Sequence, residues 1–164
     1  MKLNNIETVN KIGEEVILKS WVNTIRKMGK IVFMDLRDRS GLIQVVLVPQ
    51  ELDEASQAII ADIKPEFVLE IFGLVNKRGE RQINKEMPTG TVEVLARSVK
   101  ILNQSATPPF EIDNETNQAG EELRFKYRYL DLRHQRMLNN LKTRHHVVRL
   151  IREFFYAADF LEIE

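Results

Sequence analysis

The sequence of 164 residues contains no cysteine. This excludes disulfide bonds, thiol catalysis and thiolate metal sites within the chain, and it is typical of a reducing compartment. The sequence also has no hydrophobic run as long as a membrane-spanning helix requires. It begins with neither a secretion signal nor an Arg- and Ser-rich organelle address. We therefore expect a cytoplasmic protein without a membrane partner.

Motifs for metal and phosphate chemistry are also missing. No glycine-rich phosphate loop occurs, and the three histidines, His134, His145 and His146, have no metal-ligand spacing with carboxylates. His145 and His146 are adjacent, so on a helix their side chains point in different directions and do not easily share one ion. We expect no metal site in this chain.

The formal net charge of zero hides two basic segments. Residues 124–152 contain nine Lys and Arg against one acidic residue, and residues 19–39 contain six against two. Basic segments of this kind either contact nucleic acid or form ordinary solvated faces.

Residues 28–49 predict a β-hairpin with a tight turn at Asp38–Gly41, because apolar residues alternate on both sides of that turn. The turn pairs apolar residues on one face, which are Leu36 with Ile43, Met34 with Val45 and Val32 with Leu47. The other face carries Ile31, Phe33, Asp35, Arg37, Leu42, Gln44 and Val46. On that face Phe33 lies diagonally across from Gln44, an arrangement that suits stacking on an unstacked base and hydrogen bonding to it. The alternative is that Phe33 packs beneath a loop.

The order of the predicted elements indicates a mainly β fold. Around the hairpin we expect a helical turn in an arm over residues 1–13, strands over residues 14–27, 66–77 and 91–102, and one helix over residues 51–63. Three strands, a helix and two strands are the order of a five-stranded Greek-key OB barrel. Such barrels bind oligonucleotides on strands two and three, here flanked by the loops 27–30 and 78–90, but the fold alone leaves protein or sugar ligands open.

The amino-acid composition and the expected secondary structure change near residue 103. Residues 103–120 are rich in Pro, Asn, Thr and Gly and indicate a linker or domain boundary. A helix with a broad apolar stripe is expected from about Leu138 to Ala158. Phe160 to Glu164 predict the opening of a strand. We expect a barrel over residues 1–103, a linker and hinge over residues 104–137, and the start of a second domain over residues 138–164 of a longer protein.

Several motifs together resemble class II aminoacyl-tRNA synthetases of the aspartate–lysine–asparagine subgroup, and within it the bacterial-type aspartyl-tRNA synthetases. The motifs are Asp35-Leu36-Arg37-Asp38-Arg39 with Gly41, Gln44-Val45-Val46, Ile83-Asn84 with Pro88-Thr89-Gly90, and ELRFKYRYLDLR at residues 122–133. The resemblance covers almost the whole chain.

The resemblance implies that the barrel binds the anticodon stem-loop of tRNA-Asp. The residues it implies for anticodon binding are Arg26, Phe33, Gln44, Arg78, Gln82, Asn84 and Glu93. Phe33 would stack on a base, Gln44 would read a base edge, and Arg26 would contact the middle base or its backbone. Glu93 would accept hydrogen bonds from the imino and amino groups of the wobble guanine. The alternative for Glu93 is an ordinary exposed strand glutamate.

The resemblance also implies a full-length homodimer that activates aspartate with ATP and Mg²⁺ and transfers it to tRNA-Asp. Its dimer interface would include Leu141, Val148, Ile151, Phe155 and Phe160. The fragment itself would contain no catalytic residue and no cofactor, and would be inactive alone. Two alternatives remain: a non-catalytic OB module that binds single strands, and the equivalent part of a lysine or asparagine enzyme.

Overall fold

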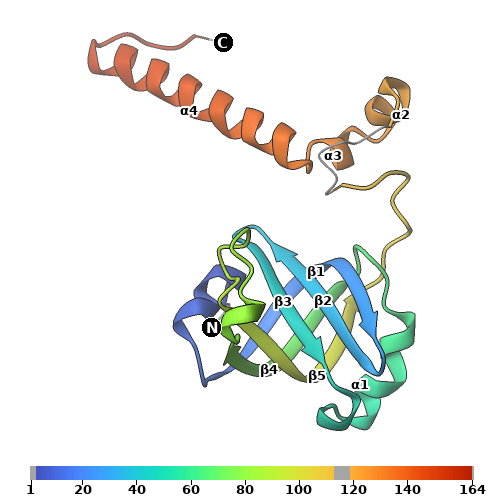
Figure 1. The fold of residues 1–164 in the computed structure, drawn as a ribbon. Coiled ribbons are helices and arrows are strands. Elements are labelled where there is room, and N and C mark those ends of the chain that lie inside the picture. The colour runs from blue at the N-terminus through green and yellow to red at the C-terminus, as the bar shows by residue number, and fades with distance from the viewer. Residues whose placement is uncertain (1–2, 113–118, 164) are drawn as a thin grey trace. The chain divides into compact units, whose positions relative to one another are not determined.

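The computed structural model describes residues 3–112 and 119–163 (Figure 1). The chain divides into two compact units, residues 1–107 and residues 108–164, and each is described by itself.

The first unit is a closed barrel of five strands, seen as the wrapped arrows in Figure 1. The strands are β1 (Glu15–Met28), β2 (Ile31–Asp38), β3 (Gly41–Leu47), β4 (Val68–Lys77) and β5 (Val92–Asn103). Their order around the barrel is β1-β2-β3-β5-β4, with β3 and β5 parallel and the other neighbours antiparallel. This confirms the mainly β, five-stranded OB barrel predicted from the sequence.

The hairpin of β2 and β3 has the predicted register. Leu36 pairs with Ile43, and both side chains are fully buried in the barrel core. The turn contains Gly41 at φ 137°, in a region of backbone space that favours glycine. Val46 lies opposite Phe33 on the predicted outer face, where it is only 7% exposed because it forms part of the lining of a hollow on that face.

The single helix predicted over residues 51–63 is three shorter pieces. These are η2 (Pro49–Glu51), α1 (Glu54–Ile59) and η3 (Ile60–Asp62), where η denotes a 3₁₀ helix. The α-helix begins late because Asp53 caps it, its side chain accepting a hydrogen bond from the backbone N–H of Ser56 at 2.7 Å. An N-cap residue has extended backbone angles, so the helix cannot continue through Asp53 toward its N-terminal side.

The arm before β1 forms the predicted helical turn, η1 (Asn5–Asn10). The loop between β4 and β5 contains a further short turn, η4 (Glu80–Gln82). Asn84 closes the rest of this loop, since its N–H donates to the carbonyl of Gly90 at 3.1 Å.

The second unit is helical, with α2 (Glu121–Lys126), α3 (Arg128–Asp131) and α4 (Gln135–Ala157). Asp131 is 1% exposed and accepts hydrogen bonds from Arg124 at 2.7 Å and Arg128 at 2.6 Å. Helix α4 begins three residues before the predicted start. None of the helices in the described ranges is both long and apolar enough to cross a bilayer.

The strand predicted from Phe160 is not formed over residues 160–163. The chain turns back after α4 instead, at Asp159 with φ 60°, and the N–H of Phe160 donates to the carbonyl of Phe155. A strand needs a hydrogen-bonded neighbour, and within the described residues this segment has none.

Candidate nucleic-acid interface

A hollow of about 360 Å³ lies on the outer face of the barrel. Strands β1, β2, β3 and β5 and the loop after β4 all contribute to it. Its lining residues are Arg26, Met28, Phe33, Gln44, Val46, Arg78, Gln82 and Glu93. The structure therefore gathers six of the seven residues predicted for anticodon binding into one hollow.

A β-bulge in β1 determines that Arg26 reaches this hollow. Val16, Leu18 and Val22 point into the core, whereas after the register shift between Val22 and Thr24 it is Ile25 that packs inward and Arg26 that faces out. A bulge adds one residue to one strand and so exchanges its inner and outer faces. Without the bulge, the alternation that begins at Val16 would point Arg26 into the barrel.

Gln44 and Glu93 are joined across the parallel pair β3 and β5. The Gln44 Nε2 group donates to Glu93 Oε2 at 3.1 Å, and the Arg78 Nε lies 3.5 Å from the same oxygen. Both contacts use Oε2, and Oε1 has no hydrogen-bond partner among the described residues. Glu93 is therefore not an ordinary exposed strand glutamate, because it is held in place with one oxygen left to accept a hydrogen bond from a ligand.

Arg78 is the most deeply buried charged group of the hollow, with 5% exposure. Its Nη1 donates to the carbonyl of Gln82 at 3.4 Å, while its buried Nε and Nη2 have no hydrogen-bond partner in the described part of the chain. Burial lowers the pKa of the Arg78 guanidinium from its ordinary value, and the charges of Glu93 and Asp35 oppose that shift. Because an unsatisfied buried donor is costly, Arg78 Nη2 is a polar group that the described residues leave uncompensated.

Asn84 is the predicted residue that does not line the hollow. Its side-chain oxygen instead accepts a hydrogen bond from the N–H of Glu86 at 3.0 Å and shapes the loop. Two further residues line the hollow: Val46, which lies on the outer face predicted for the hairpin, and Met28, which was not predicted. Met28 is 68% exposed as the last residue of β1, and its position two residues after Arg26 on the same strand is the sequence signal that it lies on the same face.

The described residues contain no group of three His, Asp or Glu side chains that could hold a metal ion. The ring of Phe33 can stack on a planar ligand, and the amide of Gln44 and the carboxylate of Glu93 can exchange hydrogen bonds with the edge of that ligand.

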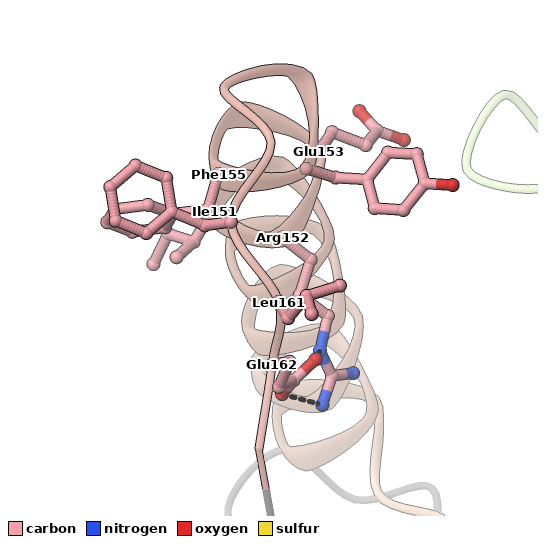
Figure 2. Close-up of a pocket in the computed structure, with 8 residues that line it drawn as sticks. Ile151, Arg152, Glu153, Phe155, Leu161 and Glu162 are labelled. Carbon is pink, nitrogen blue, oxygen red and sulfur yellow. Dashed lines mark hydrogen bonds and ion pairs between the residues drawn. The ribbon is translucent and has the colours of Figure 1, made fainter.

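A second hollow, of about 590 Å³, lies in the helical unit between α4 and the segment that runs back along it (Figure 2). Phe155 and Leu161 line it, and an ion pair between Arg152 and Glu162 at 2.8 Å spans one side. The predicted interface residues lie along this helix and the segment after it: Leu141, Ile151, Phe155 and Phe160 are exposed, and Val148 is half-buried. The charged residues of its lining are Arg152, Glu153 and Glu162, and the other lining residues are apolar or aromatic.

Residues 16–102 match the family of OB-fold nucleic acid binding domains, and residues 120–164 match the class II tRNA synthetases (D, K and N). The chain therefore belongs to the family of OB-fold nucleic acid binding domains. More particularly, it is similar to the aspartate–tRNA ligase of Staphylococcus aureus strain Newman, with 42% identity over 153 residues. This confirms the resemblance to aspartyl-tRNA synthetases. The match covers 93% of this chain and 26% of the relative, so the chain spans about a quarter of the length of the curated relatives it matches.

Several solved structures share the fold, and two of them are described here. One is an aspartyl tRNA synthetase from Entamoeba histolytica, with a TM-score of 0.85 and 19% identity, covering 100% of this chain and 39% of that chain. The other is an asparaginyl-tRNA synthetase from Pyrococcus horikoshii, complexed with asparaginyl-adenylate, with a TM-score of 0.81, 23% identity and coverage of 100% and 36%. At these identities the likeness establishes the fold.

Proposed function

We propose that this chain is the N-terminal, anticodon-recognising part of an aspartate–tRNA ligase and that its barrel binds the anticodon stem-loop of tRNA-Asp. The observation that carries the proposal is the composition of the barrel hollow. It combines the ring of Phe33, the amide of Gln44, the carboxylate of Glu93 and the buried guanidinium of Arg78. An aromatic ring beside groups that both donate and accept is what recognition of a splayed-out base requires.

Glu93 and Arg78 have complementary roles toward guanine. The carboxylate of Glu93, whose Oε1 is free, accepts from the N1–H and N2–H groups of the base, and Arg78 holds that carboxylate through Oε2. Phe33 stacks on a neighbouring base, a contact that typically contributes about 1–3 kcal/mol. Arg26, whose side chain is 58% exposed at the rim, contacts the middle base or its backbone. Gln82 and Asn84 belong to the loop that closes over the anticodon.

The activity of the whole protein is part of the proposal. The full-length enzyme activates aspartate with ATP and Mg²⁺ and transfers it to tRNA-Asp in the cytoplasm. The ATP and Mg²⁺ chemistry belongs to the portion of the relatives that this chain does not span, so no catalytic step is assigned to the residues described here. The apolar stripe of α4 supports a homodimer, with Leu141, Val148, Ile151, Phe155 and Phe160 at its interface.

The experiment is binding of the chain to an anticodon stem-loop with the sequence GUC and to loops with single-base changes, at one fixed low salt concentration. We expect a preference for guanine at the first position. Glu93→Ala removes that preference, which corresponds to about 1–3 kcal/mol for a good two-bond contact to a base. Phe33→Ala weakens binding to every loop. Glu70→Gln is the matched control, because Glu70 pairs with Lys19 at 2.9 Å and does not line the hollow.

The alternative function, binding of single strands without sequence preference, gives a different result. It predicts equal affinity for all loops and no change of preference in Glu93→Ala. A preference for a first-position base other than guanine would instead favour the lysine enzyme.

A further inference from the structure

We propose that Asp35 is a positioning residue that holds Arg26 over the barrel hollow, so that Arg26 faces the middle base in preference to the RNA backbone, and thereby fixes the orientation of the Gln44 amide. The inference deepens the proposed function and rests on it. Asp35 does not line the hollow, and its contacts alone point to this role.

Asp35 is the centre of a hydrogen-bond chain across three strands. Its carboxylate accepts from the hydroxyl of Thr24 at 2.7 Å and from Arg26 Nη2 at 3.1 and 3.2 Å. Thr24 lies directly opposite Asp35 in the sheet, and Gln44 lies opposite it on the other side. The side chain of Asp35 is 15% exposed, against 58% for Arg26, so the carboxylate is the fixed partner and the guanidinium is the group it orients.

The orientation passes from Arg26 to Gln44. The same Nη2 that binds Asp35 also donates to Gln44 Oε1 at 3.3 Å, while Gln44 Nε2 donates to Glu93 at 3.1 Å. An amide whose oxygen faces a cation and whose nitrogen faces a carboxylate has only one favourable orientation. If Asp35 no longer holds Arg26, one side of this arrangement is lost and the amide can rotate to present either end to a base.

Asp35 also limits what Arg26 does with phosphates. An exposed arginine on a nucleic-acid surface attracts the RNA backbone irrespective of sequence, and each added phosphate contact steepens the salt dependence of binding. The carboxylate partly neutralises Arg26 and keeps it beside the bases. Asp35 therefore increases discrimination among anticodon loops and lowers the sequence-independent affinity for RNA.

A purely structural ion pair is the competing explanation. An ion pair with one exposed partner on the surface contributes little to stability, and Asp35 lies on the outer face of the sheet and not in the core. The two explanations differ in what Asp35→Asn changes, since the loss of a purely structural pair would alter the free energy of unfolding and leave discrimination among the loops unchanged.

The test is a double-mutant cycle with Asp35→Asn, Arg26→Ala and the double variant, measured as binding to the GUC stem-loop and to single-base-changed loops at two salt concentrations. In Asp35→Asn we expect discrimination among loops to fall about tenfold and the slope of log affinity against log salt to steepen by about 0.7, the value for one added contact to a single strand. In the Arg26→Ala background, Asp35→Asn then has no further effect. Glu70→Gln makes the same change of net charge and leaves discrimination unchanged.

An RNA-free measurement separates this inference from the proposed function. In the NMR spectrum of the chain, the Arg26 guanidinium signals are those of a held side chain in the wild type and of a freely rotating one in Asp35→Asn. The signals of Arg37, which donates to Glu66 at 2.8 Å, are the internal control and do not change.

The failure of the positioning role of Asp35 and the failure of the proposed anticodon recognition give different results. Unchanged Arg26 signals in Asp35→Asn, or equal effects of Asp35→Asn with and without Arg26, overturn the positioning role even where the GUC preference is established. A wild-type chain with no preference among loops overturns the proposed function and the specificity part of this inference together.

Discussion

The first prediction concerns Asn5, which joins the N-terminal arm to the hairpin. Asn5 is fully buried, and its Nδ2 donates to the carbonyls of Leu36 and Gly41, both at 3.1 Å. Its Oδ1 accepts from the hydroxyl of Ser20 at 2.9 Å, and its backbone N–H donates to Asp38 at 2.8 Å. One side chain thus connects the arm to β1, to β2 and to the turn that sets the hairpin register.

The expected cost of Asn5→Ala follows from these three side-chain bonds. At about 1 kcal/mol for each net hydrogen bond, their loss lowers the free energy of unfolding by about 3 kcal/mol. Asn5→Asp keeps the shape but replaces the donor with an oxygen that faces two carbonyl oxygens. We therefore expect Asn5→Asp to be at least as destabilising as Asn5→Ala at neutral pH.

The assay is urea denaturation followed by the fluorescence of Trp21, the one tryptophan of the sequence, which lies on β1 of the barrel. Asn10→Ala is the matched control, because Asn10 is an exposed residue of the same 3₁₀ turn, and its effect should stay within about 0.5 kcal/mol. The reasoning is refuted if Asn5→Ala costs less than about 1 kcal/mol, or no more than Asn10→Ala.

Two further predictions concern stability. Gly73→Ala places a Cβ against the carbonyl oxygen of Leu95, a backbone atom that cannot move aside, so we expect a loss of about 1–3 kcal/mol in urea denaturation. Gly79→Ala, whose Cβ would lie 3.4 Å from a flexible side chain, is its near-neutral control. In the helical unit, the hydrogen bond from Arg124 lowers the pKa of Asp131 against the opposing effect of burial. Because the folded pKa is the lower one, the stabilisation is present above the unfolded value of about 3.9 and is lost as the pH falls through the folded pKa. The NMR shifts of the backbone amides in α2 and α3 should change over the pH range in which this stabilisation is lost. In Asp131→Asn these amide shifts should no longer depend on pH in that range.

The barrel was predictable because its signals are local. Alternation of apolar residues identifies each strand, and the turn that ends in Gly41 fixes the hairpin register, so the pairing of Leu36 with Ile43 followed from the sequence. The errors occurred where one interaction changed a local pattern. Asp53 caps α1 and divides the predicted helix, and the segment from Phe160 has the residues of a strand but no strand beside it.

The side chains of the candidate site could be predicted from the sequence pattern only in part. Phe33 and Gln44 were found from the hairpin pattern, because both lie on the outer face of a regular two-stranded ribbon. Glu93 and Arg78 came only from the resemblance, since no sequence periodicity brings β5 and the end of β4 beside β3. Asp35 was placed on the outer face, but its contacts with Thr24 and Arg26 depend on the register between β1 and β2.

That register is set by residues far from Arg26 in the sequence. The bulge after Val22 is held by the backbone of Glu66, whose N–H donates to the Val22 carbonyl at 2.7 Å and whose φ of 69° is unusual for a residue with a side chain. Arg37 binds both Glu66 at 2.8 Å and Asn23, inside the bulge, at 2.8 Å. A contact between β1, β2 and the start of β4 therefore decides which face of the barrel Arg26 occupies. Since alternation alone would place Arg26 in the core, the basic rim of the hollow is a property of the tertiary fold and not of the strand that carries it.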